Sequence, residues 1–117
     1  MIVGIGVDII EIARIEKALN SPSFAEKIYL DKEKANKSAN TLAGYFAAKE
    51  ALSKAFGTGF NKISPNEIEI ANDDLGKPFV ILHGRAKKLA SDMGITNIHL
   101  SISHSKDNAM AFVVAEK

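Results

Sequence analysis

The sequence predicts a single α+β domain over residues 1–117, in which a largely antiparallel sheet is packed by one long helix and several short ones. Two observations predict this class. Alternation of apolar and polar residues, typical of strands, occurs at the start of the chain and in two turn-linked pairs of segments later on. A long run with a helical apolar period lies between them. This order is typical of helices that cover one face of an antiparallel sheet.

Composition narrows the function classes. A hydrophobic share of 46% with 25% charged residues is ordinary for a globular protein. The lack of cysteine excludes disulfides and thiolate metal sites and fits a reducing compartment. No basic segment precedes the first apolar run, and Asp8 and Glu11 interrupt it, so we expect a cytoplasmic protein without a membrane partner. A net charge of +1 does not favour nucleic acid as a partner.

The first predicted element is a strand over residues 2–9. Its residues alternate between an apolar face of Val3, Ile5, Val7 and Ile9 and a second face of Gly4, Gly6 and Asp8. We expect the apolar face to lie in the core and the glycine face to be bare. Glycines weaken a strand, which is tolerable where another backbone or a ligand must come close.

Short helices are predicted after this strand. Ile12, Ile15 and Leu19 form an apolar helical stripe, which Asn20-Ser21-Pro22 ends. A second short helix follows and ends near Leu30. The charged segment 31–40 fits either a solvated helix or a loop, and the sequence does not distinguish them.

The long helix is predicted from Thr41, as its N-cap, to Phe56, and Gly57-Thr58-Gly59 ends it. Farther along, residues 67–71 and 79–82 form a predicted hairpin across the turn at 72–78. A helix over 85–92 ends before Gly94, and strands over 98–103 and 109–114 form a second hairpin.

Phe46, Glu50 and Lys54 recur at spacings of four on the long helix and therefore share one line, with Ser53 beside it. Two interpretations are open. Glu50 and Lys54 could form a surface ion pair, which contributes roughly 0.3 to 0.5 kcal/mol. Alternatively, Glu50 and Asp8 bind Mg²⁺, which prefers one or two carboxylates plus waters and phosphate oxygens, while Lys54 meets that phosphate.

The histidines give a weaker signal. Ser101 to Ser105 place hydroxyls and His104 at a strand end, but no strand-to-helix elbow or oxyanion motif favours hydrolysis. His83 and His99 lack metal-ligand spacing, and we interpret both as structural.

Taken together, the motifs resemble one family. GIGVDIIEIARI at residues 4–15, FAAKEALSKAFGTG at 46–59, Gly76-Lys77-Pro78 and LSISHS at 100–105 are similar in order and spacing to holo-[acyl-carrier-protein] synthases, the short phosphopantetheinyl transferases. The resemblance spans most of the chain except residues 21–40. It implies the 4'-phosphopantetheinyl transferase fold, in a homotrimer whose active sites lie between neighbouring subunits.

The resemblance also implies a reaction: magnesium-dependent transfer of 4'-phosphopantetheine from coenzyme A to a serine of apo acyl carrier protein. Asp8 and Glu50 would bind the metal, and Lys54 would face the phosphate. The general base would be Glu50 or water. The residues around coenzyme A would be Lys49, Ser53, Gly57, Gly76, Lys77, Pro78, His104 and Ser105. Arg14 would meet the acidic carrier protein.

One position departs from the family. Tyr45 stands where many members carry an arginine, so one phosphate contact of coenzyme A is lost or replaced by a hydroxyl. The alternative function is a non-catalytic trimeric module that binds a nucleotide or a carrier protein.

Overall fold

The computed structural model describes residues 1–117. Its elements are β1 (Ile2–Glu11), α1 (Ile12–Ala18), α2 (Pro22–Ile28), α3 (Asp31–Lys34), α4 (Ala39–Phe56), the 3-10 turn η1 (Pro65–Glu67), β2 (Ile68–Asn72), β3 (Pro78–Leu82), α5 (Gly84–Asp92), β4 (Asn97–His104) and β5 (Asn108–Glu116). Every strand pair is antiparallel. The α+β class and both hairpins are therefore confirmed.

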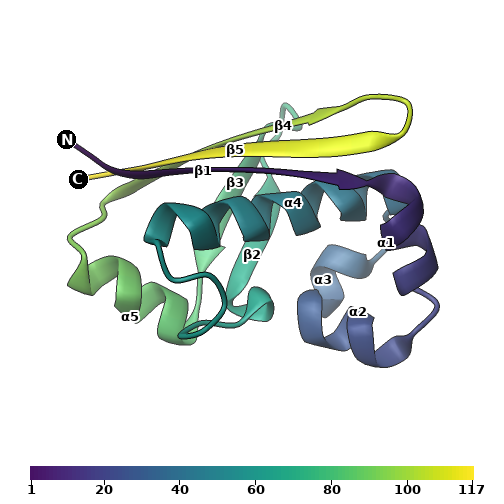
Figure 1. Cartoon of the computed structure of the whole chain (residues 1–117), viewed down its shortest axis with the longest axis horizontal. Helices are drawn as coiled ribbons and strands as arrows, with labels where there is room; N and C mark the ends of the chain where they lie inside the picture. The colour runs from purple at the N-terminus through teal and green to yellow at the C-terminus, as the bar shows by residue number, and fades with distance from the viewer.

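The strands form two sheets rather than one. A three-stranded sheet has the order β1-β5-β4, and β2 pairs with β3 in a separate hairpin. β3 lies near β4 without ladder pairing. Helix α4 runs beneath β1 and β5, with α1, α2 and α3 gathered on one side of the molecule and α5 on the other (Figure 1). None of the helices combines the length and apolar character that a bilayer crossing requires.

Segment 31–40, which the sequence left open, holds the one-turn helix α3 and the start of α4. The predicted N-cap of α4 was wrong by three residues, because Ser38 takes this role and its Oγ accepts a hydrogen bond from the Thr41 N–H at 3.2 Å. The predicted end was correct: Gly57 adopts a left-handed φ of 80° after Phe56.

The predicted orientation of β1 was also wrong. Its apolar face points outward, and Ile5 and Ile9 are 60% and 64% exposed. The glycine face instead lies on α4: a Cβ on Gly4 would be 2.1 Å from the Ala55 carbonyl oxygen, and one on Gly6 would be 1.8 Å from that of Ala51. A strand can lie this close to a helix backbone only where it carries no side chain.

The core lies between α4 and the three-stranded sheet, and small residues on both sides allow the close approach. The fully buried alanines here are Ala43, Ala47, Ala48 and Ala51 of α4 and Ala109, Ala111 and Ala115 of β5. Larger core residues such as Leu52 and Val113 fill the remaining space. The result is a rigid platform that fixes β1 against α4.

Candidate active site

Asp8 shares the inward face of β1 with Gly4 and Gly6, so its carboxylate is directed toward α4 of the same chain. The Lys54 ammonium donates to Asp8 Oδ1 at 3.3 Å and to the Val7 carbonyl oxygen at 2.9 Å. The Asp8 side chain is 16% exposed and that of Lys54 is 52% exposed. The glycine face thus brings a strand carboxylate and a helix lysine together at an accessible place.

Glu50 adds a second carboxylate to this place. Burial raises the pKa of Glu50 above the usual carboxyl value, the negative charge of Asp8 raises it further, and the Lys54 ammonium acts in the opposite direction. Lys54 forms its ion pair with Asp8 and not with Glu50. The interpretation of Glu50 and Lys54 as a simple surface pair is therefore wrong.

The donor set fits Mg²⁺. Asp8 and Glu50 would supply carboxylate oxygens from two facing elements, β1 and α4. A site with two protein carboxylates suits a hard cation that completes its octahedron with waters and substrate phosphate oxygens. Mutual repulsion of the two carboxylates also favours a cation between them.

A hollow of about 460 Å³ opens beside Glu50. Its wall contains the aromatic side chains of Phe24, Phe46 and Phe60, and Lys27 and Arg85 also line it. Phe24 and Phe46 pack against each other with ring centroids 6.2 Å apart. The apolar wall can hold a neutral part of a ligand. A cation bound at Glu50 would allow an anionic group of the same ligand to lie next to it.

A second hollow, of about 210 Å³, lies where β3 passes β4. Gly76, Pro78 and His104, all predicted to contact coenzyme A, line it together with Tyr45. His104 Nε2 donates to the Asn40 carbonyl oxygen at 2.8 Å, since a carbonyl can only accept. This hollow shares no lining residue with the one beside Glu50, so the predicted residues form two groups within one chain.

Two residues predicted to lie around coenzyme A, Lys49 and Ser53, are buried in this structure. Lys49 is 1% exposed, and its ammonium donates to Glu33 Oε1 at 2.8 Å and to the carbonyl oxygens of Pro65 and Ile68. Ser53 is also buried, and its hydroxyl donates to the Glu50 carbonyl oxygen at 2.7 Å. Lys49 and Ser53 share a helix face that points into the core, so both have structural roles.

The other predicted residues are more peripheral. Gly57 ends α4 in open space, and Lys77 and Ser105 lie in exposed turns. Arg14 is exposed on α1. The sequence prediction missed Asn72, whose amide oxygen accepts from the Tyr45 hydroxyl. Its position at the end of a strand before an Asp-Asp turn was the available signal.

The sequence of this chain is similar to those of proteins from one known family. A family model described as the 4'-phosphopantetheinyl transferase superfamily matches residues 4–113. The holo-[acyl-carrier-protein] synthase of Clostridium novyi (strain NT) is 46% identical over an alignment of 122 positions, and the alignment covers 99% of this chain and 88% of that protein.

Two solved structures extend the comparison. The holo-[acyl-carrier-protein] synthase from Neisseria meningitidis has a TM-score of 0.90 at 42% identity, with 100% of both chains covered. The synthase from Bacillus anthracis str. Ames in complex with CoA (3',5'-ADP) has a TM-score of 0.81 at 47% identity and covers 98% of this chain and 96% of that one. The fold, the motif order and these similarities show that the chain belongs to the 4'-phosphopantetheinyl transferase superfamily, within the group of the holo-[acyl-carrier-protein] synthases.

Proposed function

We propose that this protein transfers the 4'-phosphopantetheine group of coenzyme A to a serine of apo acyl carrier protein and releases adenosine 3',5'-bisphosphate. The observation that carries the proposal is the meeting of Asp8, Glu50 and Lys54 at the junction of β1 and α4. The relatives named above are holo-[acyl-carrier-protein] synthases, and the one from Bacillus anthracis was solved in complex with CoA (3',5'-ADP).

The chemistry requires stabilisation of charge on two phosphates. Bound Mg²⁺ would neutralise part of the charge on the phosphate oxygens, and we assign Asp8 and Glu50 as its protein ligands. Lys54, oriented by the Val7 carbonyl oxygen and by Asp8, directs its ammonium to the same phosphates. Glu50 lacks a side-chain partner of its own and is one candidate acceptor for the proton of the carrier serine.

Coenzyme A would occupy both hollows. The neutral pantetheine arm suits the aromatic wall beside Glu50, and the nucleotide end suits the hollow formed by Gly76, Pro78 and His104. Because these hollows share no residue, we infer that neighbouring subunits of a homotrimer each contribute one of them. Exposed apolar residues on the outer face of the three-stranded sheet support association: Ile5, Val7, Ile9, Met110 and Phe112. Light scattering of the purified protein would test the trimer, and a monomer would contradict it.

Arg14 is the proposed contact for the acidic carrier protein, because it is exposed on α1 beside the end of β1. Arg14→Ala should raise the KM for the carrier and leave the affinity for coenzyme A unchanged. The reverse pattern in a titration would place the docking face elsewhere. The cytoplasmic location stays a prediction, which cell fractionation would test.

The direct test is to incubate the protein with coenzyme A, Mg²⁺ and apo acyl carrier protein and to weigh the carrier by mass spectrometry. We expect a gain of one phosphopantetheinyl group, and no gain when a chelator removes the metal. An unmodified carrier in the complete mixture, with coenzyme A still bound, would instead support the non-catalytic binding module.

A further inference from the structure

The turn between β2 and β3 is stabilised by hydrogen bonds among its own residues. Asp73 Oδ1 accepts from the backbone N–H groups of Leu75 and Lys77, both at 2.9 Å. The Gly76 N–H donates to the Asp73 carbonyl oxygen at 2.9 Å, and Gly76 has a left-handed φ of 86°. These bonds fix the shape of the turn, but none of them fixes where the turn lies relative to α4.

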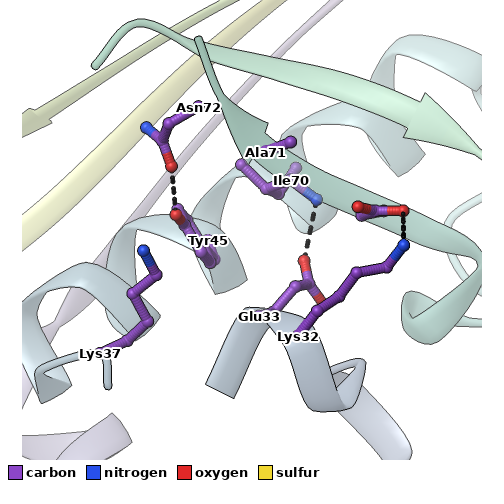
Figure 2. Close-up of a pocket in the computed structure, with 8 residues that line it drawn as sticks. Lys32, Glu33, Lys37, Tyr45, Ile70, Ala71 and Asn72 are labelled. Carbon is purple, nitrogen blue, oxygen red and sulfur yellow. Dashed lines mark hydrogen bonds and ion pairs between the residues drawn. The ribbon is translucent and has the colours of Figure 1, made fainter. Parts of the chain in front are cut away.

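One hydrogen-bonded path connects this turn to α4. The Tyr45 hydroxyl donates to Asn72 Oδ1, and Asn72 Nδ2 donates to the Gly76 carbonyl oxygen at 3.0 Å. Figure 2 shows Tyr45 directed from α4 toward Asn72 at the end of β2. No other hydrogen bond joins residues 72–78 to α4. The β2–β3 ladder and the Lys49 bond to the Ile68 carbonyl oxygen hold the rest of the hairpin, so Tyr45 and Asn72 provide the one hydrogen-bonded link from α4 to the turn itself.

Tyr45 is suited to this role. Its side chain is buried, and burial, followed by the negative charge of Glu33, raises the pKa of the Tyr45 phenol. The hydroxyl therefore keeps its proton and acts as the donor to Asn72. A buried tyrosine has few rotamers open to it, so the position of its oxygen is set by the packing of α4.

We propose that Tyr45 and Asn72 form a relay that positions Gly76 and Pro78 to bind the nucleotide end of coenzyme A. All four residues line the hollow of about 210 Å³. The inference rests on the proposed function, because it takes coenzyme A as the ligand of that hollow. Tyr45 and Asn72 are positioning residues here, and they act on the ligand through the turn.

The test compares Tyr45→Phe with Tyr29→Phe. Both substitutions remove one hydroxyl from a buried ring, but the Tyr29 hydroxyl donates to the Leu42 carbonyl oxygen at 2.7 Å, and Tyr29 lines neither hollow. For Tyr45→Phe we expect the KM and the calorimetric Kd for coenzyme A to rise by about 3- to 10-fold, as the loss of one hydrogen bond implies, with kcat unchanged. Tyr29→Phe should change neither constant.

Two further measurements separate a relay from a direct contact with the ligand. Tyr45→Phe should speed hydrogen exchange of the Gly76 and Lys77 amides in the protein without coenzyme A. The Tyr45→Phe/Asn72→Ala double variant should bind coenzyme A no more weakly than Asn72→Ala alone, because both changes interrupt one path.

Unchanged exchange in Tyr45→Phe, or additive losses in the double variant, would overturn the relay. If the wild-type protein binds coenzyme A and modifies the carrier while Tyr45→Phe behaves as Tyr29→Phe does, only this inference fails. If the wild-type protein binds no coenzyme A, the proposed function fails as well, and the exchange rates still decide whether Tyr45 holds the turn.

Discussion

Lys49 and Lys54 lie five positions apart on α4 and meet opposite surroundings. Lys49 is buried, its ammonium donates to three oxygens, and it lies 5.7 Å from the Tyr29 ring centroid. Lys54 is half exposed and contacts one carboxylate and one carbonyl. Both lysines form an ion pair, yet only that of Lys54 leaves charge accessible to a ligand.

The carboxylates differ in the same way. Glu33 accepts from the Lys49 ammonium and from the backbone N–H groups of Leu30 and Ile70, so its oxygens are fully used inside the protein. Figure 2 shows the bond between Glu33 and Ile70. Glu50, by contrast, is half buried next to Asp8, and its pKa is raised by burial and by that charge. The candidate site therefore differs from the buried Glu33–Lys49 ion pair in that the charge of Glu50 is not neutralised by a hydrogen-bonded partner within the protein.

The largest expected effect is on transfer. Asp8→Asn and Glu50→Gln should each reduce phosphopantetheine transfer by about 1,000-fold or more, because each removes a charge that the metal and phosphates require. Thermal unfolding should change little, since neither carboxylate supports the core. Mass spectrometry of the carrier measures the loss of transfer, and a thermal melting curve measures the stability of each variant. Near-normal transfer by either variant at ordinary Mg²⁺ would remove that residue from the site.

The two lysines give the next contrast. Lys49→Met leaves Glu33 buried without its ammonium partner and should reduce the free energy of unfolding by about 3 to 5 kcal/mol. The matched variant Lys54→Met should cost less than about 1 kcal/mol, because its ion pair is half exposed, but it should lose transfer activity. Urea denaturation of the two variants measures the difference. Equal losses of stability would mean that the two ion pairs do not differ as described.

The contact between β1 and α4 can be tested through Gly6. In Gly6→Ala the new methyl group would meet the Ala51 carbonyl oxygen, a backbone atom that no rotamer change can move. We expect a loss of about 1 to 3 kcal/mol in stability, typical of overpacking, and a fall in transfer because Asp8 is displaced from α4. A stable and fully active Gly6→Ala protein would show that this close contact is not needed.

The smallest expected effect is on the pH dependence of stability and concerns Glu67, whose carboxylate accepts hydrogen bonds from Ser64 and Arg85. Burial alone would raise the pKa of Glu67, but hydrogen bonds from the Ser64 and Arg85 N–H groups and the Arg85 charge outweigh it and lower the pKa below its usual value. A lowered folded-state pKa stabilises the protein above the unfolded value of about 4.5, and this contribution is lost as pH falls through the folded-state pKa. Wild-type protein should therefore be more stable than Glu67→Gln near neutral pH and should lose that advantage in acid. Denaturation of both proteins from pH 7 to pH 3 measures it, and a constant difference would contradict the assignment.

Much of this molecule follows from local sequence signals. The helices other than α3, the two hairpins and the glycine end of α4 were predictable because periodicity and turn residues act over a few positions. The burial of β1 was not. Alternation shows that two faces differ, but whether the apolar or the glycine face lies inward depends on the helix against which the strand packs.

The candidate site was predictable to a similar extent. The spacing of Glu50 and Lys54 showed that they share a helix face, and Asp8, which follows two glycines on a strand, was the proposed second carboxylate, a role that the family resemblance also implied. Spacing could not show that Lys49 points into the core, because its partners Glu33, Pro65 and Ile68 are distant in the sequence. Ser53 lies on the same helix face and is buried with it. The pairing of Tyr45 with Asn72 was hidden for the same reason.

The central claim is that Asp8 and Glu50 together hold the cation that binds the phosphates of coenzyme A. Calorimetric titration of coenzyme A with and without Mg²⁺ tests it most directly. For the wild-type protein, Mg²⁺ should tighten binding, whereas Asp8→Asn and Glu50→Gln should bind equally with and without the metal. In the absence of Mg²⁺, both variants should bind at least as tightly as the wild type, because one repulsive carboxylate is gone. Retention of the full Mg²⁺-dependent gain by either variant would contradict the account.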